Sequence, residues 1–143
     1  MVDVSEKTKT RRTAHARAEI RLPHPAQLAL ESHNKKGSPL HTAVIGGIMA
    51  AKQTWQLVPL CHQIPLDKVD VEVAQSEEDK SVVVVSCKVS AFHHTGVEME
   101  ALVGASIASC VVYDMLKAAS HGIVIESVRL VEKTGGKKDF KGQ

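Results

Sequence analysis

Two carboxylates, Glu98 and Glu100, stand at the start of a segment of small and apolar residues that is predicted to be helical. Carboxylates near a helix N-terminus are stabilised as anions by the helix dipole, and they accept hydrogen bonds from a guanidine-like ring edge. The tetrapeptide TGVE at 95–98 also fits a capping box, with Thr95 as N-cap and Glu98 at N3. That role accounts for Glu98, so Glu100 is the stronger candidate for chemistry.

A second candidate pair, Asp114 and Lys117, lies three residues apart near the end of the same predicted helix. Side chains at this spacing contact each other. Such pairs usually lie on the surface, where they contribute little. If the pair is buried beside Glu98 or Glu100, it instead tunes the lysine for proton transfer. The residues alone leave both interpretations open.

Cys61 and His62 occupy a loop between two prolines, which is unusual for the sequence LCH. In the structural interpretation, Leu60 and Cys61 fill the core and His62 caps a turn. A metal site is less favoured, because no second histidine stands at ligand spacing.

Lysines stand beside glycines in two predicted loops, Lys36-Gly37 and the segment KTGGK at 133–137. Glycine lets backbone N–H groups approach a phosphate and lysine supplies charge, although short loops of this kind are common and neither is a Walker motif. Cations also crowd both tails, at Lys7, Lys9, Arg11, Arg12, Lys137, Lys138 and Lys141. Composition alone favours solvated tails over an anionic substrate as the explanation.

Period-two alternation predicts strands over 14–22, 69–73, 82–89 and 123–131, with a turn at 76–79. Helices are predicted over 26–33, 41–57 and 95–119, and Gly46-Gly47 would permit close backbone approach in the second of them. Residues 1–11 and 134–143 are predicted to be mobile. The simplest solution is an α+β, ferredoxin-like fold: an antiparallel sheet with helices packed on one face. The 143 residues are predicted to form one domain.

Composition and charge argue against several classes of protein function. Apolar residues make up 43% and charged residues 24%, as in ordinary globular proteins. A net charge of +2 is too small to indicate nucleic-acid binding, and no apolar run approaches the roughly 20 residues that a membrane span needs. Three distant cysteines, without an export signal, indicate a reducing compartment. We therefore expect a soluble cytoplasmic protein that binds neither nucleic acid nor membrane.

Read together, several blocks resemble one family. They are MVDVS at the start, the R-x-A-x-A-x-A pattern of residues 12–18, Lys36-Gly37, AAKQTWQLVPLCH (50–62), TGVEMEAL (95–102), YDMLKA (113–118) and VRLVEKTGGK (128–137). In this order they resemble the cyclic pyranopterin monophosphate synthase family of molybdenum cofactor biosynthesis, over nearly the whole chain. Two positions depart from the family's usual pattern: Ser38-Pro39 follows Lys36-Gly37, and His93-His94 precedes TGVEMEAL.

The resemblance implies a set of site residues. Lys36 and Lys117 would be the catalytic lysines, with Asp114 holding Lys117, while Arg12 and Lys133 would hold a triphosphate. His62, Glu98 and Glu100 would bind or protonate a purine-derived ring. The substrate-binding residues that the resemblance implies are Cys61, His62, Glu98, Met99, Glu100, Arg12, Lys133 and, as a secondary candidate, Lys52.

The resemblance also implies the reaction and its setting. The substrate would be 3′,8-cyclo-7,8-dihydro-GTP, made by a partner radical enzyme, and the products would be cyclic pyranopterin monophosphate and diphosphate. The active site would lie at a dimer interface in a homo-hexamer built as a trimer of dimers. No cofactor and no protein-bound metal would be required, although Mg²⁺ often accompanies a triphosphate. The rival interpretations are a non-catalytic nucleotide or pterin carrier and a histidine-rich metal-binding protein.

Overall fold

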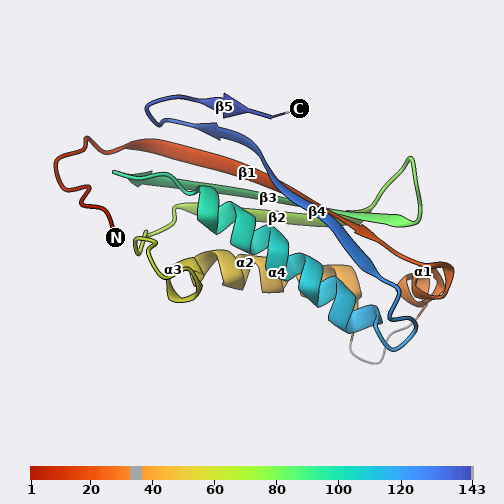
Figure 1. Cartoon of the computed structure of the whole chain (residues 1–143). Helices are drawn as coiled ribbons and strands as arrows, with labels where there is room; N and C mark the ends of the chain where they lie inside the picture. Colours follow the sequence, from red (N-terminus) through yellow and green to blue (C-terminus); the bar gives the residue numbers. More distant parts are fainter. Residues whose placement is uncertain (33–36, 143) are drawn as a thin grey trace.

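The computed structural model describes residues 1–32 and 37–142, and its centre is one five-stranded sheet (Figure 1). The strands are β1 (Thr10–Arg21), β2 (Lys68–Gln75), β3 (Val82–His93), β4 (Val124–Thr134) and β5 (Phe140–Lys141). Their order across the sheet is β2-β3-β1-β4-β5, and each neighbouring pair is antiparallel. The helices are α1 (His24–Glu31), α2 (Pro39–Lys52), α3 (Thr54–Leu57) and α4 (Glu98–Leu116).

The alternation of small and polar residues in β1 decides which face of the sheet is buried. Ala14, Ala16, Ala18 and Ile20 are at most 2% exposed, whereas the residues between them point to the opposite face. Ala16 lies opposite Cys87 of β3, which is also fully buried. The small side chains of the central strand allow α4 to lie close to the sheet.

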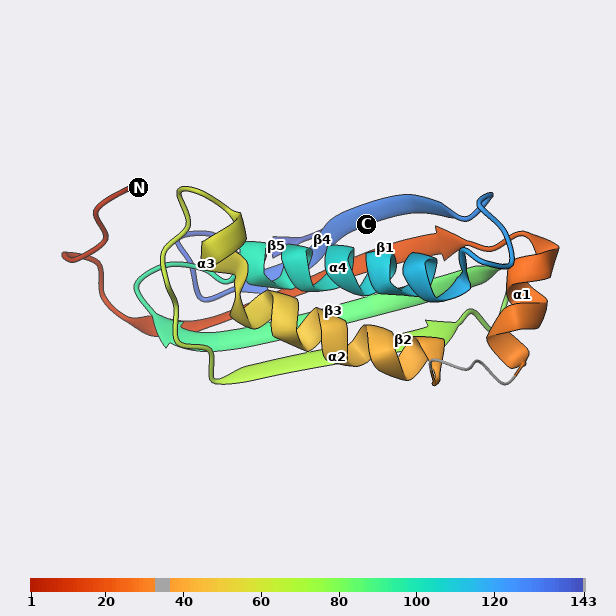
Figure 2. The same ribbon diagram turned by 90° about the horizontal axis from the view of Figure 1, so that it is seen from below.

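Helices α2 and α4 cover that face side by side, seen from below in Figure 2. Two glycines face each other between these helices: an added Cβ on Gly47 would lie 3.0 Å from the carbonyl oxygen of Gly104, and one on Gly104 would lie 3.2 Å from the carbonyl oxygen of Gly47. The glycine pair predicted to permit close approach thus contributes one of these residues, Gly47.

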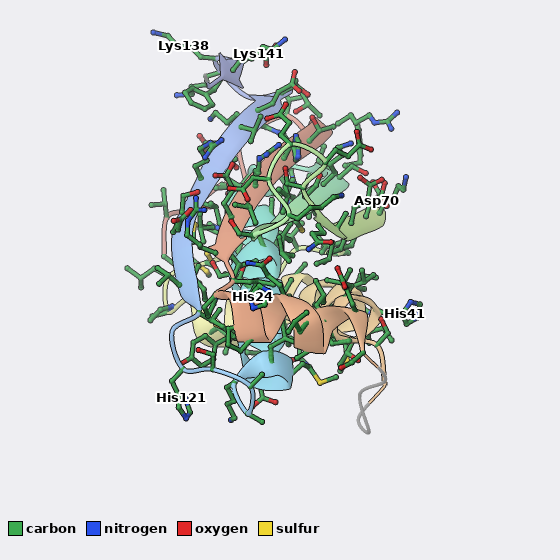
Figure 3. The ribbon with its side chains drawn as sticks, turned by 90° about the vertical axis from the view of Figure 1, so that its right-hand side faces the viewer. His24, His41, Asp70, His121, Lys138 and Lys141 are labelled. Carbon is green, nitrogen blue, oxygen red and sulfur yellow. The ribbon has the colours of Figure 1, made fainter. Side chains whose placement is uncertain are left out.

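The order of elements and strands confirms the predicted ferredoxin-like α+β fold, an antiparallel sheet with helices on one face. The short α1 lies across one end of the sheet, in the foreground of Figure 3. Pro25 stands in the first turn of α1, where its missing N–H has no helical partner to lose.

Several predicted boundaries were wrong. The helix predicted over 41–57 is broken at Gln53 into α2 and α3. The tail predicted to be loose contains β5, in which Phe140 pairs with Lys133 of β4. The predicted capping box is absent: Val97 is the N-cap of α4 and no side chain caps it. The carboxylate of Glu98 is drawn instead to a cation on β4, as described below.

By length and composition alone, α4 would be able to cross a membrane. Half of that stretch is buried inside the fold, and its fully buried residues include Ala101, Ala105, Ala108 and Val112. We therefore identify α4 as the core helix of the sheet.

Candidate functional site: a cationic pocket at the N-terminal end of α4

A pocket of about 660 Å³ lies at the N-terminal end of α4. Four segments far apart in the sequence line it: the N-terminal arm (Met1–Lys9), the start of β1, the turn from β3 into α4, and the hairpin that joins β4 to β5. The residues that line it are Lys7, Arg12, His94, Thr95, Gly96, Glu98, Lys133, Gly136, Lys137, Lys138, Asp139 and Phe140. Three predicted substrate-binding residues, Arg12, Glu98 and Lys133, are thus brought together.

Arg12 is held in place by the backbone at the end of β3. Its Nε donates to the carbonyl of His93 at 3.3 Å, and its Nη2 donates to the carbonyl of His94 at 3.1 Å. Its Nη1 lies toward Gly136, where an added Cβ would come within 3.1 Å of it. Two anchored donors fix the plane of the guanidinium, which is the geometry that planar recognition of phosphate requires.

Lys133, on β4, forms an ion pair with Glu98: Nζ lies 3.0 Å from Oε1, and both side chains are about one-third exposed. This long-range pair explains why Glu98 does not form the predicted capping box. The ion pair uses Oε1 of Glu98 and one N–H of Lys133. The other carboxylate oxygen and the other lysine N–H groups can still bind a ligand, and the ion pair fixes their position.

The β4–β5 hairpin carries two more lysines to the rim of the pocket. Its turn depends on Gly135, which has φ +81° and where an added Cβ would overlap the carbonyl oxygen of Arg11. The N–H of Gly135 donates to Asp139 Oδ1 at 3.0 Å, and its carbonyl accepts from Thr10 Oγ1 at 2.7 Å. The hairpin that bears Lys137 and Lys138 is therefore tied to the start of β1; Figure 3 shows Lys138 on this hairpin.

The pocket is strongly cationic. Its lining contains five cations (Lys7, Arg12, Lys133, Lys137 and Lys138) and two carboxylates (Glu98 and Asp139). Such an excess around one hollow raises the local concentration of anions and can stabilise charge that develops on a departing phosphate. The arrangement suits a ligand with several negative charges close together.

Glu100 lies two residues into α4 and is only 4% exposed. Burial raises the pKa of Glu100 to about 7; its own backbone N–H lowers this pKa and the neighbouring Glu98 carboxylate raises it. Burial and the charge of Glu100 also raise the pKa of the Cys61 thiol, which places the predicted PLCH loop beside α4. Met99, between the two glutamates, is 37% exposed.

Two histidines near this end of α4 have distinct environments. His62 donates from Nε2 to the carbonyl of Val2 at 2.7 Å. His93 has a buried Nδ1 without a hydrogen-bond partner in the part of the chain that the structure describes. Burial, and then the charges of His94 and Lys9, lower the pKa of His93. Neutral imidazole is thus favoured at His93.

The predicted catalytic pair lies at the other end of α4. Lys117 Nζ is 2.6 Å from Asp114 Oδ1, and both side chains are about half exposed. The hydrogen bond that Lys117 donates to Asp114 raises the pKa of Lys117. At 1.5 Å per residue, Asp114 lies about 24 Å along the helix axis from Glu98. Within one chain the structure therefore does not bring this pair to the cationic pocket.

The remaining predicted site residues lie elsewhere. Lys52 is exposed at the end of α2 and lines a separate hollow between α2 and the segment that leads into β2. Lys36 lies outside the described residues. Helix α2 begins at the end of the molecule where α4 ends (Figure 2).

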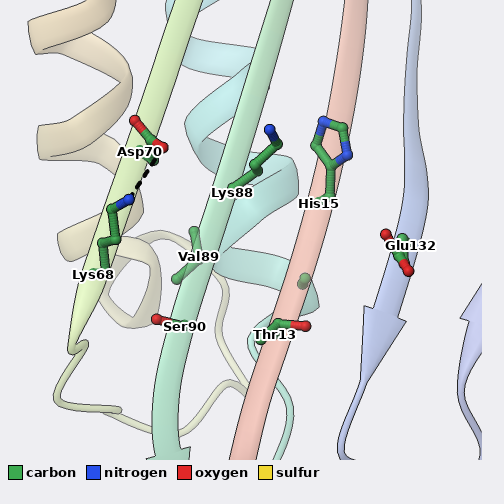
Figure 4. A pocket seen from close by; sticks show the side chains of 9 residues that line it. Thr13, His15, Lys68, Asp70, Lys88, Val89, Ser90 and Glu132 are labelled. Carbon is green, nitrogen blue, oxygen red and sulfur yellow. Dashed lines mark hydrogen bonds and ion pairs between the residues drawn. The ribbon is translucent and has the colours of Figure 1, made fainter.

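A smaller pocket of about 240 Å³ lies on the helix-free face of the sheet (Figure 4). Asp70, Lys88, His15 and Glu132 form one row across four strands, and His15 Nε2 is hydrogen-bonded to Ser86 Oγ at 2.9 Å. Burial and the nearby Lys88 lower the pKa of His15. No residue that the sequence predicts for the site lines this pocket.

Sequence reasoning did not assign Lys7, His94 or Lys138 to a site, and it named Lys137 only within the weak KTGGK signal for a phosphate. The crowding of cations in the two tails carried their signal, but composition alone favours solvated tails; the His93-His94 departure indicated two possible protonation sites near Glu98. The missing information is three-dimensional: the start of β1 and the hairpin after β4 pair beside each other, so both tails end at the same pocket.

The fold and this site together define an α+β protein with a cationic pocket at one end of α4, where Glu98 lines the pocket and the buried acid Glu100 follows two residues later. A sequence profile of the MoaC family matches residues 1–136. The cyclic pyranopterin monophosphate synthase of Thermomicrobium roseum is 46% identical over 138 residues, which cover 96% of this chain and 82% of that protein. The protein of the same name from Xanthomonas oryzae pv. oryzae is 46% identical over 143 residues, covering 98% and 86%. The chain belongs to the MoaC family.

Proposed function

We propose that this chain converts 3′,8-cyclo-7,8-dihydro-GTP to cyclic pyranopterin monophosphate with release of diphosphate, an early step of molybdenum cofactor biosynthesis. The names of its relatives favour this activity. The observation that carries it is the adjacency of a pocket lined by five cations and a buried carboxyl group, Glu100, with a pKa of about 7. A triphosphate and a ring that exchanges protons need these two features together.

In the proposed reaction the triphosphate lies in the cationic pocket. Formation of a cyclic phosphate breaks the bond between the α- and β-phosphates, and negative charge accumulates on the departing diphosphate. Arg12 and Lys133 would neutralise that charge, because preorganised cations in a partly enclosed site stabilise it more than water does. Arg12 is already oriented by the carbonyls of His93 and His94.

Glu100 is suited to the proton transfers that accompany rearrangement of the ring. A carboxyl group with a pKa of about 7 exists in both forms near neutral pH, so it can donate and accept protons. Glu98 would accept hydrogen bonds from the guanidine edge of the substrate, with Cys61, His62 and Met99 lining the ring.

We further propose that Lys117 and Asp114 act on substrate held by a second copy of the chain, in a homo-hexamer built as a trimer of dimers. The separation of about 24 Å along α4 favours a site shared between chains. Large apolar side chains on the helical layer also remain exposed, as expected of a surface that is covered on assembly: Ile45, Met49, Trp55, Leu57 and Leu60. Lys36 remains the predicted second catalytic lysine.

The donor set of the pocket does not suit a metal held by the protein. The two carboxylates that line it are engaged, Glu98 with Lys133 and Asp139 with the N–H of Gly135, and the described residues include no cluster of three His, Cys, Asp or Glu. Any Mg²⁺ would arrive with the triphosphate. The substrate would come from a radical enzyme, and we place the reaction in the cytoplasm.

Incubation of the purified protein with enzymatically generated 3′,8-cyclo-7,8-dihydro-GTP tests the proposal, with mass spectrometry of the products. We expect cyclic pyranopterin monophosphate and diphosphate in equal amounts. The matched control is the Glu100→Gln variant, which keeps the shape of the side chain and removes its titration. Binding of the substrate without either product would identify a carrier and overturn the proposal.

A further inference from the structure

We propose that Lys7 is a further substrate-binding residue of the cationic pocket, and that His94 is the positioning residue that holds it there. The N-terminal arm would then be part of the binding site. The identity of the ligand, the triphosphate of a nucleotide derivative, rests on the proposed function. The role of the arm in binding a phosphate chain rests on the geometry below.

The arm is folded locally and tied to the body of the protein at two points. Locally, the N–H of Lys7 donates to the carbonyl of Val4 at 3.1 Å, and the N–H of Ser5 donates to Asp3 Oδ1 at 2.9 Å. His62 donates from its ring to the carbonyl of Val2 at 2.7 Å, and His94 donates from Nδ1 to the carbonyl of Lys7. Because a carbonyl only accepts, each ring must carry its proton on the nitrogen that faces the arm.

His94 joins two cations of the pocket. Its carbonyl accepts from Arg12 Nη2 at 3.1 Å, and its ring holds the backbone of Lys7. The two contacts use different atoms of His94, so the position of the turn after β3 determines the positions of both Arg12 and the backbone of Lys7. An arm fixed through its backbone leaves the long side chain of Lys7 to adapt to the ligand, while the guanidinium of Arg12 stays rigid.

The pocket thus receives cations from several elements: Lys7 from the arm, Arg12 and Lys133 from the neighbouring strands β1 and β4, and Lys137 and Lys138 from the hairpin. A single phosphate would need two or three such donors on one side. Cations that come from several segments match an extended chain of phosphates. Among the described residues of the arm, Lys7 is the one that lines the pocket.

Calorimetric titration of the full-length protein with inorganic tripolyphosphate tests the inference. We expect Lys7→Gln to weaken binding about fivefold to tenfold, because one charge-assisted contact in a partly solvated site is lost. The matched control is Lys9→Gln, an exposed lysine of the same arm that does not line the pocket; it should bind like the parent. In turnover assays Lys7→Gln should raise KM and leave kcat unchanged.

His94 is tested by a pair of variants. His94→Ala removes the ring donor and should weaken tripolyphosphate binding about as much as Lys7→Gln, with little further loss in the double variant. His94→Asn places an N–H donor near the position of Nδ1 and should restore most of the affinity. Failure of Asn to rescue, or additive losses in the double variant, would overturn the positioning role.

The outcomes separate this inference from the proposed function. Equal tripolyphosphate affinities for Lys7→Gln and Lys9→Gln would overturn the role of the arm even if the parent makes the product. A clear loss in Lys7→Gln alone, in a parent protein that makes no product, would support the arm as an anion-binding element and reject the proposed reaction.

Discussion

The two ends of α4 carry the two candidate pairs, Glu98 with Glu100 and Asp114 with Lys117, and the pairs differ in burial, in partners and in the cause of their pKa shifts. At the N-terminal end, Glu100 is 4% exposed and Glu98 is bound to a lysine from another strand. At the C-terminal end, Asp114 and Lys117 contact each other within one turn of helix and are about half exposed. Only the first end has an environment that alters acid–base behaviour through burial.

In one chain, therefore, the N-terminal end of α4 has a buried acid and a long-range ion pair, whereas the Asp114-Lys117 pair at the C-terminal end remains exposed to solvent. An exposed lysine paired with aspartate keeps its proton, since the hydrogen bond that Lys117 donates to Asp114 raises the pKa of Lys117. A proton-transfer lysine needs the opposite shift, which desolvation supplies. In our proposal the surface of a second chain covers Lys117 and thereby desolvates it. The most informative experiments therefore treat the two ends of one α4 helix as parts of different active sites.

The largest effect is expected from combining variants of opposite ends. Lys117→Ala and Glu100→Gln should each lower the rate of product formation by about 10²–10⁴-fold, the usual contribution of a general acid or base. Co-expression of the two variants with different tags, followed by isolation of mixed oligomers, should restore about a quarter of the parent activity. A shared site is intact only where a Lys117→Ala chain supplies the N-terminal end and a Glu100→Gln chain supplies the C-terminal end, which random pairing at a two-fold interface gives in about one site in four.

The control for this experiment is a pair of variants from the same end, Asp114→Asn with Lys117→Ala. Mixed oligomers of these two contain no intact C-terminal end, so their activity should not exceed the slow turnover of the Asp114→Asn variant alone. If the opposite-end mixture is equally inactive although mixed oligomers are present, the site is contained within one chain.

A second prediction concerns the pH dependence of stability at the buried end. The folded chain raises the pKa of Glu100 from 4.5 to about 7, so it binds this proton more tightly than the unfolded chain. The stabilising effect of the proton is complete below pH 4.5 and is lost as pH rises toward 7, on the order of 3 kcal/mol in all. Glu100→Gln keeps a neutral side chain and should therefore be more stable than the parent above pH 7.

Urea unfolding at pH 4.5 and pH 8 measures this difference. The gain in Glu100→Gln should be near zero at the lower pH and on the order of 3 kcal/mol at the higher one. Glu77→Gln, at an exposed residue in the turn between β2 and β3, should show no gain at either pH. A gain in Glu100→Gln that does not depend on pH would contradict the burial of an ionisable carboxyl group.

The central part of the fold could be predicted from the sequence, and the ends near the site could not. Alternation of alanines with polar residues predicted the middle of β1 because burial decides the pattern there. The strands continue beyond that pattern, to Thr10 in β1, His93 in β3 and Thr134 in β4. The extensions of β1 and β4 are polar and are held by pairing across the sheet, such as Thr13 with Thr134. Hydrophobic periodicity carries no information about them.

The candidate site shows the same limit. The motifs of the resemblance contained Arg12, Glu98 and Lys133, and the structure brings these three together. The local interpretation of Glu98 as a capping residue was wrong, because its partner lies 35 residues further along the chain, on β4. Contacts at such separation cannot be read from spacing. For the same reason the cations of the two tails were attributed to solvent.

A third prediction compares cations inside and outside the pocket. Arg12→Ala and Lys133→Ala should each weaken tripolyphosphate binding by about 1.5–3 kcal/mol, the usual value of a hydrogen bond to a charged group. Arg17→Ala is the matched control, since Arg17 lies on the same strand as Arg12, pairs with Glu19 at 3.1 Å and does not line the pocket. Equal losses in all three variants would indicate general electrostatic attraction rather than a defined site, and the affinity should then depend on net charge alone.

The smallest expected effect is that of Asp114 and Lys117 on the free energy of unfolding. Measured beside turnover, it shows whether a variant of this pair fails in chemistry or in folding. Lys117→Arg keeps the charge and Asp114→Asn keeps the shape, and the pair is about half exposed in one chain. Exposed ion pairs contribute little to stability, so thermal unfolding of a dilute, dissociated sample should be unchanged in both variants. Turnover should nevertheless fail in Lys117→Arg, because arginine does not release its proton near neutral pH. Asp114→Asn should slow turnover by removing the charge that orients the lysine. Normal turnover in Lys117→Arg would show that Lys117 is an ordinary surface residue, and the proton transfers would then have to be assigned to the buried end of α4.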